Sequence, residues 1–237
     1  PENTLAALTV AMEEMADAAE IDVQTTEDGA VVLCHDINLK RVAGVNRRLG
    51  DLTLEEARGL DVGSYFSEEF AGEGIPTLEE ALTLCQGRLK LNIELKDLGA
   101  DSCLPEKTAE IIREWGMEEQ CVISSVRLSY LERVKAVCPE LKAGLILPAA
   151  YGRYYEDESV DFISIRASLA NRRLVEAAHE AGRAVHVWTV NRPAELKSMA
   201  LLGADNLITD YPARAREILY EEAASGGILD SLRMLLR

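Results

Sequence analysis

Aromatic residues and histidines are scarce in this sequence: aromatic residues make up 5% of its 237 residues, and there are three histidines. Long apolar runs are missing as well. No stretch of about eighteen apolar residues occurs, so no segment is expected to span a membrane as a helix. The segment 1–14 lacks the basic start of a secretory signal peptide. The chain opens on Pro1 rather than on methionine, which is typical of a fragment.

Basic residues are in deficit, with 25 Lys and Arg against 41 Asp and Glu, for a formal net charge of −16. A surface of that charge repels nucleic acid and anionic lipid headgroups, so nucleic acid is excluded as a partner. If the substrate is a small phosphate ester, a cation, a lysine or an arginine must cancel the repulsion locally.

Paired cysteines are also lacking, because the five cysteines are odd in number and no two have the spacing of metal ligands. Neither a disulfide framework nor a zinc site is therefore expected. We interpret them as buried free thiols of a reducing compartment. They are Cys34, Cys85, Cys103, Cys121 and Cys138.

The sequence does contain β-rich apolar runs that alternate with amphipathic helical patterns. This order is typical of an α/β protein in which parallel strands are covered by helices, and the length fits one TIM-type (β/α)8 barrel. The runs lie at 19–24, 31–35, 89–95, 121–126, 143–148, 160–166, 184–190 and 206–209, and the helical patterns at 108–116, 129–138, 171–182 and 193–203.

The strand count falls one short of a closed barrel. The run 31–35 follows 19–24 across a link too short for a crossover helix, so these two form a hairpin. Seven parallel strands remain, whereas such a barrel has eight. The helical pattern at 4–18 should follow a strand, and we therefore expect the first strand to be absent from this chain.

Two segments depart from the alternation of strands and helices. Residues 37–78 hold no barrel strand, so we interpret about 37–78 as a small inserted subdomain, with a helix at 52–61, inside a single barrel domain 1–237. Residues 221–237 have the pattern of a terminal helix broken at Gly226–Gly227, packed outside the barrel.

Three carboxylates lie where strands of such a barrel carry their chemistry. Glu20 and Asp22 flank Ile21 and therefore point to one face of their strand, and Glu94 lies in a second apolar strand. Buried carboxylates are costly unless they are compensated, and all-oxygen ligation favours Mg²⁺ or Ca²⁺. The alternative is ion pairing, for which Lys96 lies on the same face as Glu94.

Of the histidines, His35 is the best candidate for proton transfer, because it ends a strand and its pKa is near neutrality. His179 has the position of a solvated helix residue, and His186 lies in mid-strand, where a structural role is usual. Trp188 either packs in the barrel or lines the substrate pocket. Asp210 is expected to brace the loop after the last strand.

Motifs along the whole chain together resemble the glycerophosphodiester phosphodiesterase family. They occur in the family's order, and this makes the resemblance specific. They are PENT (1–4), EIDVQTTEDGAVVLCHD (20–36), IPTLEEAL (75–82), NIELK (92–96), HVWTVN (186–191) and GADNLITDYP (203–212).

The resemblance implies a TIM-type barrel that hydrolyses glycerophosphodiesters to glycerol 3-phosphate and an alcohol. It implies one divalent cation, Mg²⁺ or Ca²⁺, bound by Glu20, Asp22 and Glu94. It makes His35 one of two acid–base histidines and Lys96 a residue that contacts the phosphate.

The resemblance further implies that Glu2 lies near the active site, while Trp188, from its position alone, stays the candidate for contact with the substrate. The family's first histidine and its neighbouring arginine should precede Pro1, so this chain alone is expected to show little activity. Arg166 stands where relatives carry an acidic residue. Some relatives are fused behind a membrane-embedded domain, which suggests a cytoplasmic or membrane-associated location.

Three alternatives stay open at this point. One is a related barrel phosphodiesterase acting on lysophospholipids or sphingomyelin, which an apolar groove beside the metal would favour. Another is a catalytically incomplete binding module. The third is a barrel whose acids form ion pairs and bind no metal.

Overall fold

The fold is described from a computed structural model, which places residues 1–147, 149 and 152–224. Within these residues, no helix combines the length and the apolar character that crossing a membrane requires.

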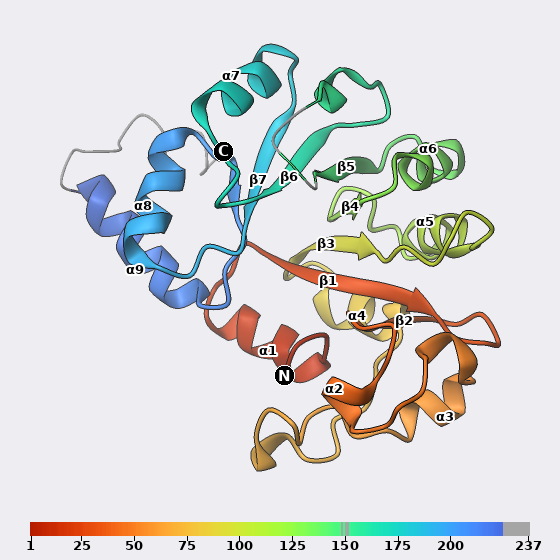
Figure 1. Ribbon diagram of the computed structural model, residues 1–237. Coiled ribbons are helices and arrows are strands. Elements are labelled where there is room, and N and C mark those ends of the chain that lie inside the picture. Colours follow the sequence, from red (N-terminus) through yellow and green to blue (C-terminus); the bar gives the residue numbers. More distant parts are fainter. Residues whose placement is uncertain (148, 150–151, 225–237) are drawn as a thin grey trace.

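The core of the molecule is one curled sheet of eight strands (Figure 1). Its strand order is β2-β1-β3-β4-β5-β6-β7-β8, and only the pair β1–β2 is antiparallel. The predicted hairpin and seven parallel strands are thus confirmed, and the architecture is a TIM-type barrel. The strands are β1 (Ala18–Thr25), β2 (Val31–Leu33), β3 (Lys90–Leu95), β4 (Cys121–Ser125), β5 (Lys142–Leu147), β6 (Phe162–Arg166), β7 (Ala184–Trp188) and β8 (Asn206–Leu207).

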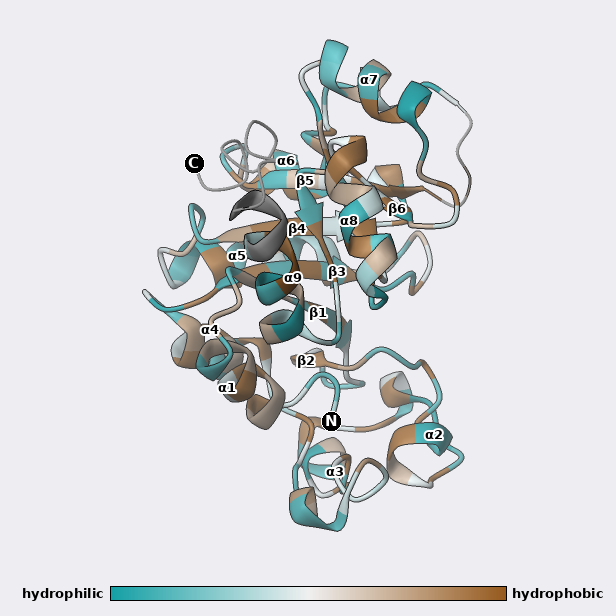
Figure 2. Cartoon of the chain, turned by 90° about the vertical axis from the view of Figure 1, so that its left-hand side faces the viewer, coloured by the Kyte–Doolittle hydropathy of each residue, from teal (hydrophilic) through white to brown (hydrophobic). Residues whose placement is uncertain are grey.

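Helices cover the outside of this sheet, and local signals set where several of them begin. Thr4 caps α1, and Thr77 forms a capping box with Glu80 at the start of α4. Figure 2 shows hydrophilic and hydrophobic residues side by side on α7, as expected for an amphipathic helix. The covering helices are α1 (Leu5–Glu13), α4 (Leu78–Cys85), α5 (Leu104–Glu114), α6 (Leu128–Val137), α7 (Arg172–Glu180), α8 (Pro193–Leu202) and α9 (Pro212–Ala224).

The last helix corrects a boundary. The sequence predicted a terminal helix over 221–237, whereas α9 begins at Pro212, because proline suits the first turn of a helix. The remainder of the predicted segment, 225–237, lies outside the described residues, as does its packing.

The strands separate two kinds of side chain by their period of two. Outward residues are aliphatic and form one apolar cluster with the helices. Inward residues of neighbouring strands meet in register, so that Asp22 lies beside Glu94, and Glu94 beside Ser124. The outward residues include Ile21, Val23, Leu91, Ile93, Leu95, Ile123, Ile163, Ile165, Val185 and Val187.

Two stacked aromatic rings fill part of the barrel interior. The rings of Phe162 and His186 stack with their centroids 4.1 Å apart. A Cβ atom on Gly144 would lie 2.0 Å from the Phe162 ring, so this position needs glycine. Burial lowers the pKa of His186 to about 4, so its ring is neutral, which agrees with the structural role expected for it.

The segment between β2 and α4 packs on β2 through an apolar cluster of its own. It holds α2 (Lys40–Ala43), α3 (Leu54–Arg58) and two 3₁₀ turns, Leu49–Asp51 and Glu68–Phe70. α3 lies within the predicted helix 52–61. In both views the segment lies at one end of the molecule, below β1 and β2. Its definition as an inserted subdomain stays a prediction. The cluster consists of Val32, Cys34, Leu39, Val42, Leu49, Leu52, Ala57, Val62 and Ile75.

The cysteines are all free, but the prediction that all are buried is wrong for one of them. Cys103 is exposed, because it stands in the loop just before α5. The other four are buried in the two apolar clusters.

Candidate active site

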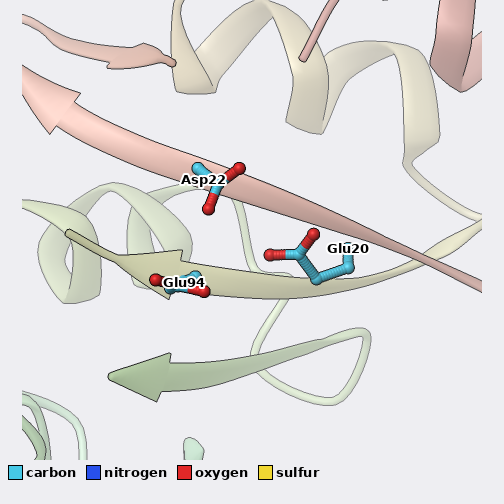
Figure 3. A group of neighbouring side chains, drawn as sticks. All are labelled: Glu20, Asp22 and Glu94. Atoms are coloured by element: carbon cyan, nitrogen blue, oxygen red, sulfur yellow. The ribbon is translucent and has the colours of Figure 1, made fainter. Parts of the chain in front are cut away.

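Three carboxylates converge inside the barrel (Figure 3). Glu20, Asp22 and Glu94 each offer an oxygen atom, and these oxygens all lie within 4.8 Å of one another. Two come from β1 and the third from β3, and the register Asp22–Glu94 brings the strands together at this level. The structure thus brings together the three residues that the sequence predicted as metal ligands.

Lys96 accounts for only part of this negative charge. Its Nζ donates to Glu94 Oε1 at 2.7 Å and to Asp22 Oδ1 at 3.1 Å. Among the described residues, none with a positive charge lies within ion-pair distance of Glu20. Ion pairing therefore compensates two carboxylates with one lysine and leaves the cluster with excess negative charge.

Burial makes this excess charge costly. Desolvation raises the pKa of Glu20 well above its ordinary value, and the nearby Asp22 and Glu94 carboxylates raise it further. Desolvation also raises the pKa of Glu94. Burial alone would lower the pKa of Lys96, but the two carboxylates outweigh it and the net shift is upward. A cluster of this kind is stabilised by a further positive charge.

Asn3 holds Asp22 in place, a contact that our sequence reasoning missed. Its Nδ2 donates to Asp22 Oδ2 at 2.8 Å, and its Oδ1 accepts from the backbone N–H of Asp22 at 2.9 Å. Asn3 has a φ of 55°, a left-handed conformation that asparagine tolerates better than most residues. The motif at 1–4 was the available signal, but it directed attention to Glu2 instead.

His35 lies in a chain of charged groups at the surface. Its side chain is 54% exposed, and its Nδ1 lies 2.8 Å from Asp36 Oδ1. Arg41 donates from Nε to Asp36 Oδ2 at 2.7 Å and from Nη1 to Glu2 Oε2 at 2.9 Å. These contacts run from His35 through Asp36 and Arg41 to Glu2, and we call these four residues the His35 chain. Gln24, on β1, donates to the backbone carbonyls of Cys34 and Asp36 and so fixes the loop that carries His35.

Arg41 stabilises the charged form of its two partners. Its hydrogen bond lowers the pKa of Asp36 to about 2 and also lowers the pKa of Glu2. Sequence reasoning missed Arg41, because nothing in the pattern around α2 shows that it reaches residues 5 and 39 positions away.

Trp188 lies at a different part of the barrel. It is half-buried at the end of β7 and lines a cavity of about 390 Å³, which favours the pocket alternative for this residue. The Arg166 guanidinium lies over its ring, 5.2 Å from the centroid.

His179 is exposed, as expected, and also forms a hydrogen bond with Asp205 at 2.8 Å. Asp210 braces its loop by accepting a 2.6 Å hydrogen bond from Asn191.

Comparison with known proteins gives one consistent result. A sequence model of the glycerophosphoryl diester phosphodiesterase family matches residues 1–214. A glycerophosphodiester phosphodiesterase of Caldanaerobacter subterraneus subsp. tengcongensis is 37% identical over 217 residues, which cover 90% of this chain and 89% of that protein.

Two solved structures are similar along nearly the whole chain. One is a phosphodiesterase of Oleispira antarctica in complex with the product sn-glycerol-3-phosphate, with a TM-score of 0.83 and 28% identity over 92% of this chain and 91% of that one. The other comes from Silicibacter pomeroyi, with a TM-score of 0.82 and 27% identity over 93% of this chain and 89% of that one.

Proposed function

Since the chain belongs to the glycerophosphoryl diester phosphodiesterase family, we propose that it hydrolyses glycerophosphodiesters to glycerol 3-phosphate and an alcohol in a cation-dependent reaction. The chain is thus a phosphoric diester hydrolase. The observation that carries the cation dependence is the convergence of Glu20, Asp22 and Glu94 around a single lysine.

The residues present fit a hard divalent cation. Three carboxylate oxygens within 4.8 Å of one another suit the oxygen ligation that Mg²⁺ and Ca²⁺ prefer. A bound cation would offset the burial and the neighbouring carboxylates that raise the pKa of Glu20. Glu20, Asp22 and Glu94 would hold the ion. When bound, it supplies Lewis-acid stabilisation of the charge on the phosphoryl oxygens.

Lys96 and His35 have separate tasks in this proposal. Lys96 stays protonated, because its pKa is raised, and it contacts a phosphoryl oxygen from beside the carboxylates. His35 binds Asp36 through Nδ1, which leaves Nε2 to exchange a proton with the substrate. We assign His35 the proton donation to the leaving alcohol, whose bond to phosphorus breaks as the oxygen of water or of a glycerol hydroxyl bonds to phosphorus. The proton of that nucleophile passes to the second acid–base histidine that the resemblance implies. Trp188 lines the part of the pocket that receives the substrate.

The test is to measure metal binding and turnover together. Asp22→Asn and Glu94→Gln should each weaken Mg²⁺ or Ca²⁺ binding in calorimetric titrations and reduce the release of glycerol 3-phosphate from glycerophosphoethanolamine. Glu176→Gln, an exposed residue on α7, is the matched control and should change neither. Full turnover after removal of metal with a chelator would refute the cation dependence.

A preference for lysophospholipids has weaker structural support. Such substrates need an apolar groove beside the catalytic centre, whereas the cavity at Trp188 adds the polar Arg166, Ser168 and Thr189 to the apolar Ala167 and Trp188. We therefore propose a diester with a short polar alcohol. If the intact protein shows no turnover, the result would indicate a binding module without activity.

A further inference from the structure

Arg166 occupies an inward position at the mouth of the barrel. It is the last residue of β6, two and four positions after the inward residues Ser164 and Phe162, so it points to the same face as they do. Its register partner on β7 is Trp188. Arg166 is nevertheless exposed, because the strand ends there and the mouth opens to solvent.

This arginine lacks the kind of partner that other arginines of the chain have. Arg41, Arg127 and Arg133 each bind a carboxylate. For Arg166, no carboxylate of the described residues lies within ion-pair distance, and its interaction is the cation–π contact with the Trp188 ring. This contact needs no N–H donor, so the guanidinium donors stay available.

A cavity large enough for a small polar group lies beside it. The cavity measures about 390 Å³, within the range of ligand pockets. Glu195 is the only carboxylate among its lining residues, and it already accepts a hydrogen bond from Arg192 at 3.2 Å. Among the described residues, the cavity therefore keeps one positive charge that no carboxylate pairs with. Its lining is Arg166, Ala167, Ser168, Trp188, Thr189 and Glu195.

The cavity and the carboxylate cluster lie around one barrel mouth but on different strands. Asp22 and Glu94 belong to β1 and β3, whereas Arg166 and Trp188 belong to β6 and β7, three and four strands further round the sheet from β3. All four are inward residues near the carboxyl ends of parallel strands. Both groups therefore face the same opening of the barrel.

Building on the proposed function, we propose that this cavity receives the leaving alcohol and that Arg166 selects alcohols carrying an anionic group, a carboxylate or a phosphate. Arginine binds such groups through two parallel N–H donors, which a lysine cannot reproduce. The contact with the Trp188 ring holds the guanidinium beside the cavity before the substrate arrives.

The experiment compares two substrates that differ only in the carboxylate. Glycerophosphoserine and glycerophosphoethanolamine share the glycerol, the phosphate and the ammonium group. We expect kcat/KM of the intact wild-type protein to favour the serine diester. Arg166→Gln should reduce kcat/KM for that diester by about tenfold, chiefly through KM, and leave the ethanolamine diester within about twofold.

Two further variants sharpen the comparison. Arg166→Glu should reverse the preference, because a carboxylate in the same place repels the serine carboxylate and attracts an ammonium group. Arg172→Gln removes an exposed arginine of α7 and should leave the ratio unchanged. An equal loss for both substrates would mean that Arg166 contacts the phosphate, and no loss for either would place it outside the substrate site. Both results overturn the proposal.

A binding measurement separates this idea from the proposed function. Calorimetric titration of the metal-loaded protein with each diester does not depend on turnover. If neither diester is hydrolysed, the proposed function fails. A tighter affinity for the serine diester that is lost in Arg166→Gln would still support the anion site, whereas equal affinities would refute it.

Discussion

The carboxylate cluster and the His35 chain are two neighbouring groups of ionisable side chains that differ in burial and in the direction of their pKa shifts. Glu20, Asp22 and Glu94 lie on barrel strands, and the pKa values of Glu20 and Glu94 are raised because burial disfavours their charge. The His35 chain is exposed, and Asp36 has a lowered pKa because Arg41 binds it.

In the proposed function, the buried cluster binds the cation and the exposed His35 chain transfers a proton. The cluster is fixed by strand register and by Asn3, so its shape is set before any ligand arrives. His35 is fixed by a loop that Gln24 anchors and by Arg41, whose segment has an apolar cluster of its own. Changes in that segment should therefore affect proton transfer before they affect metal binding.

Replacing His35 with alanine should separate the two functions most strongly. We expect turnover to fall by about 10²–10⁴-fold, as for the loss of a general acid, with metal affinity unchanged. Steady-state kinetics and calorimetric metal titration measure the two effects. His179→Ala, which removes an exposed histidine bonded to Asp205, is the control. Near-normal turnover in the His35 variant would rule out the assigned role.

Leu49→Ala tests whether the segment behind His35 is energetically separate. Leu49 is fully buried in the apolar cluster of the segment between β2 and α4. The empty space left by its side chain should therefore lower the free energy of unfolding by about 2–5 kcal/mol. We expect faster amide hydrogen exchange between β2 and α4 and a reduced kcat, with metal affinity retained. Leu131→Ala, fully buried in the barrel cluster, is the control for a general loss of stability. A parallel loss of metal affinity in Leu49→Ala would contradict the separation.

Asn3 offers the converse test, since it acts on the cluster rather than on His35. Loss of its two bonds to Asp22 should weaken metal affinity by about 10–100-fold, the usual effect of removing a group that orients a ligand. Asn3→Gly tolerates the left-handed backbone and removes only the side chain. Calorimetric titration would show an unchanged affinity if Asp22 needs no such support.

The smallest expected effect concerns acid stability. Asp36 has its pKa lowered to about 2 by Arg41, so the pair stabilises the fold above the ordinary carboxylate pKa, and this stability is lost as pH falls through about 2. Arg41→Gln should therefore cost about 1 kcal/mol at pH 7, after allowance for solvent screening.

The difference between Arg41→Gln and wild type should shrink between pH 4 and pH 2, and urea unfolding across this range measures it. Arg47→Gln, from an exposed pair with Glu56, is the control. A difference that grows as the pH falls would contradict the sign of the predicted effect.

The barrel could be predicted from the sequence because its strands are local patterns. The run 121–126 and β4, or the run 160–166 and β6, differ by at most two residues at either end. Terminal boundaries were harder. α9 was placed nine residues too late, because its amphipathic pattern is weak, and Cys103 was taken as buried although its flanking residues gave no apolar run.

The site was predictable where strand alternation and register determine it. The spacing of Glu20 and Asp22 fixed their common face, and Glu94 followed from the neighbouring strand. Arg41 and Asn3 were not predictable in this way. Their contacts depend on how the segment between β2 and α4 and the first residues of the chain fold back onto β1 and β2. No periodic sequence pattern predicts such contacts.

The alternation of aliphatic outward residues and polar inward residues also bears on how such a protein can change its chemistry over time. Ile21 and Ile93 attach their strands to the helices, while Asp22 and Glu94, next to them in the chain, face the mouth. A substitution at an inward position such as Arg166 leaves every outward contact of its strand intact. A single mutation at such a position can therefore alter the barrel mouth without removing apolar contacts to the helices, and relatives with one scaffold can diverge in what they cleave.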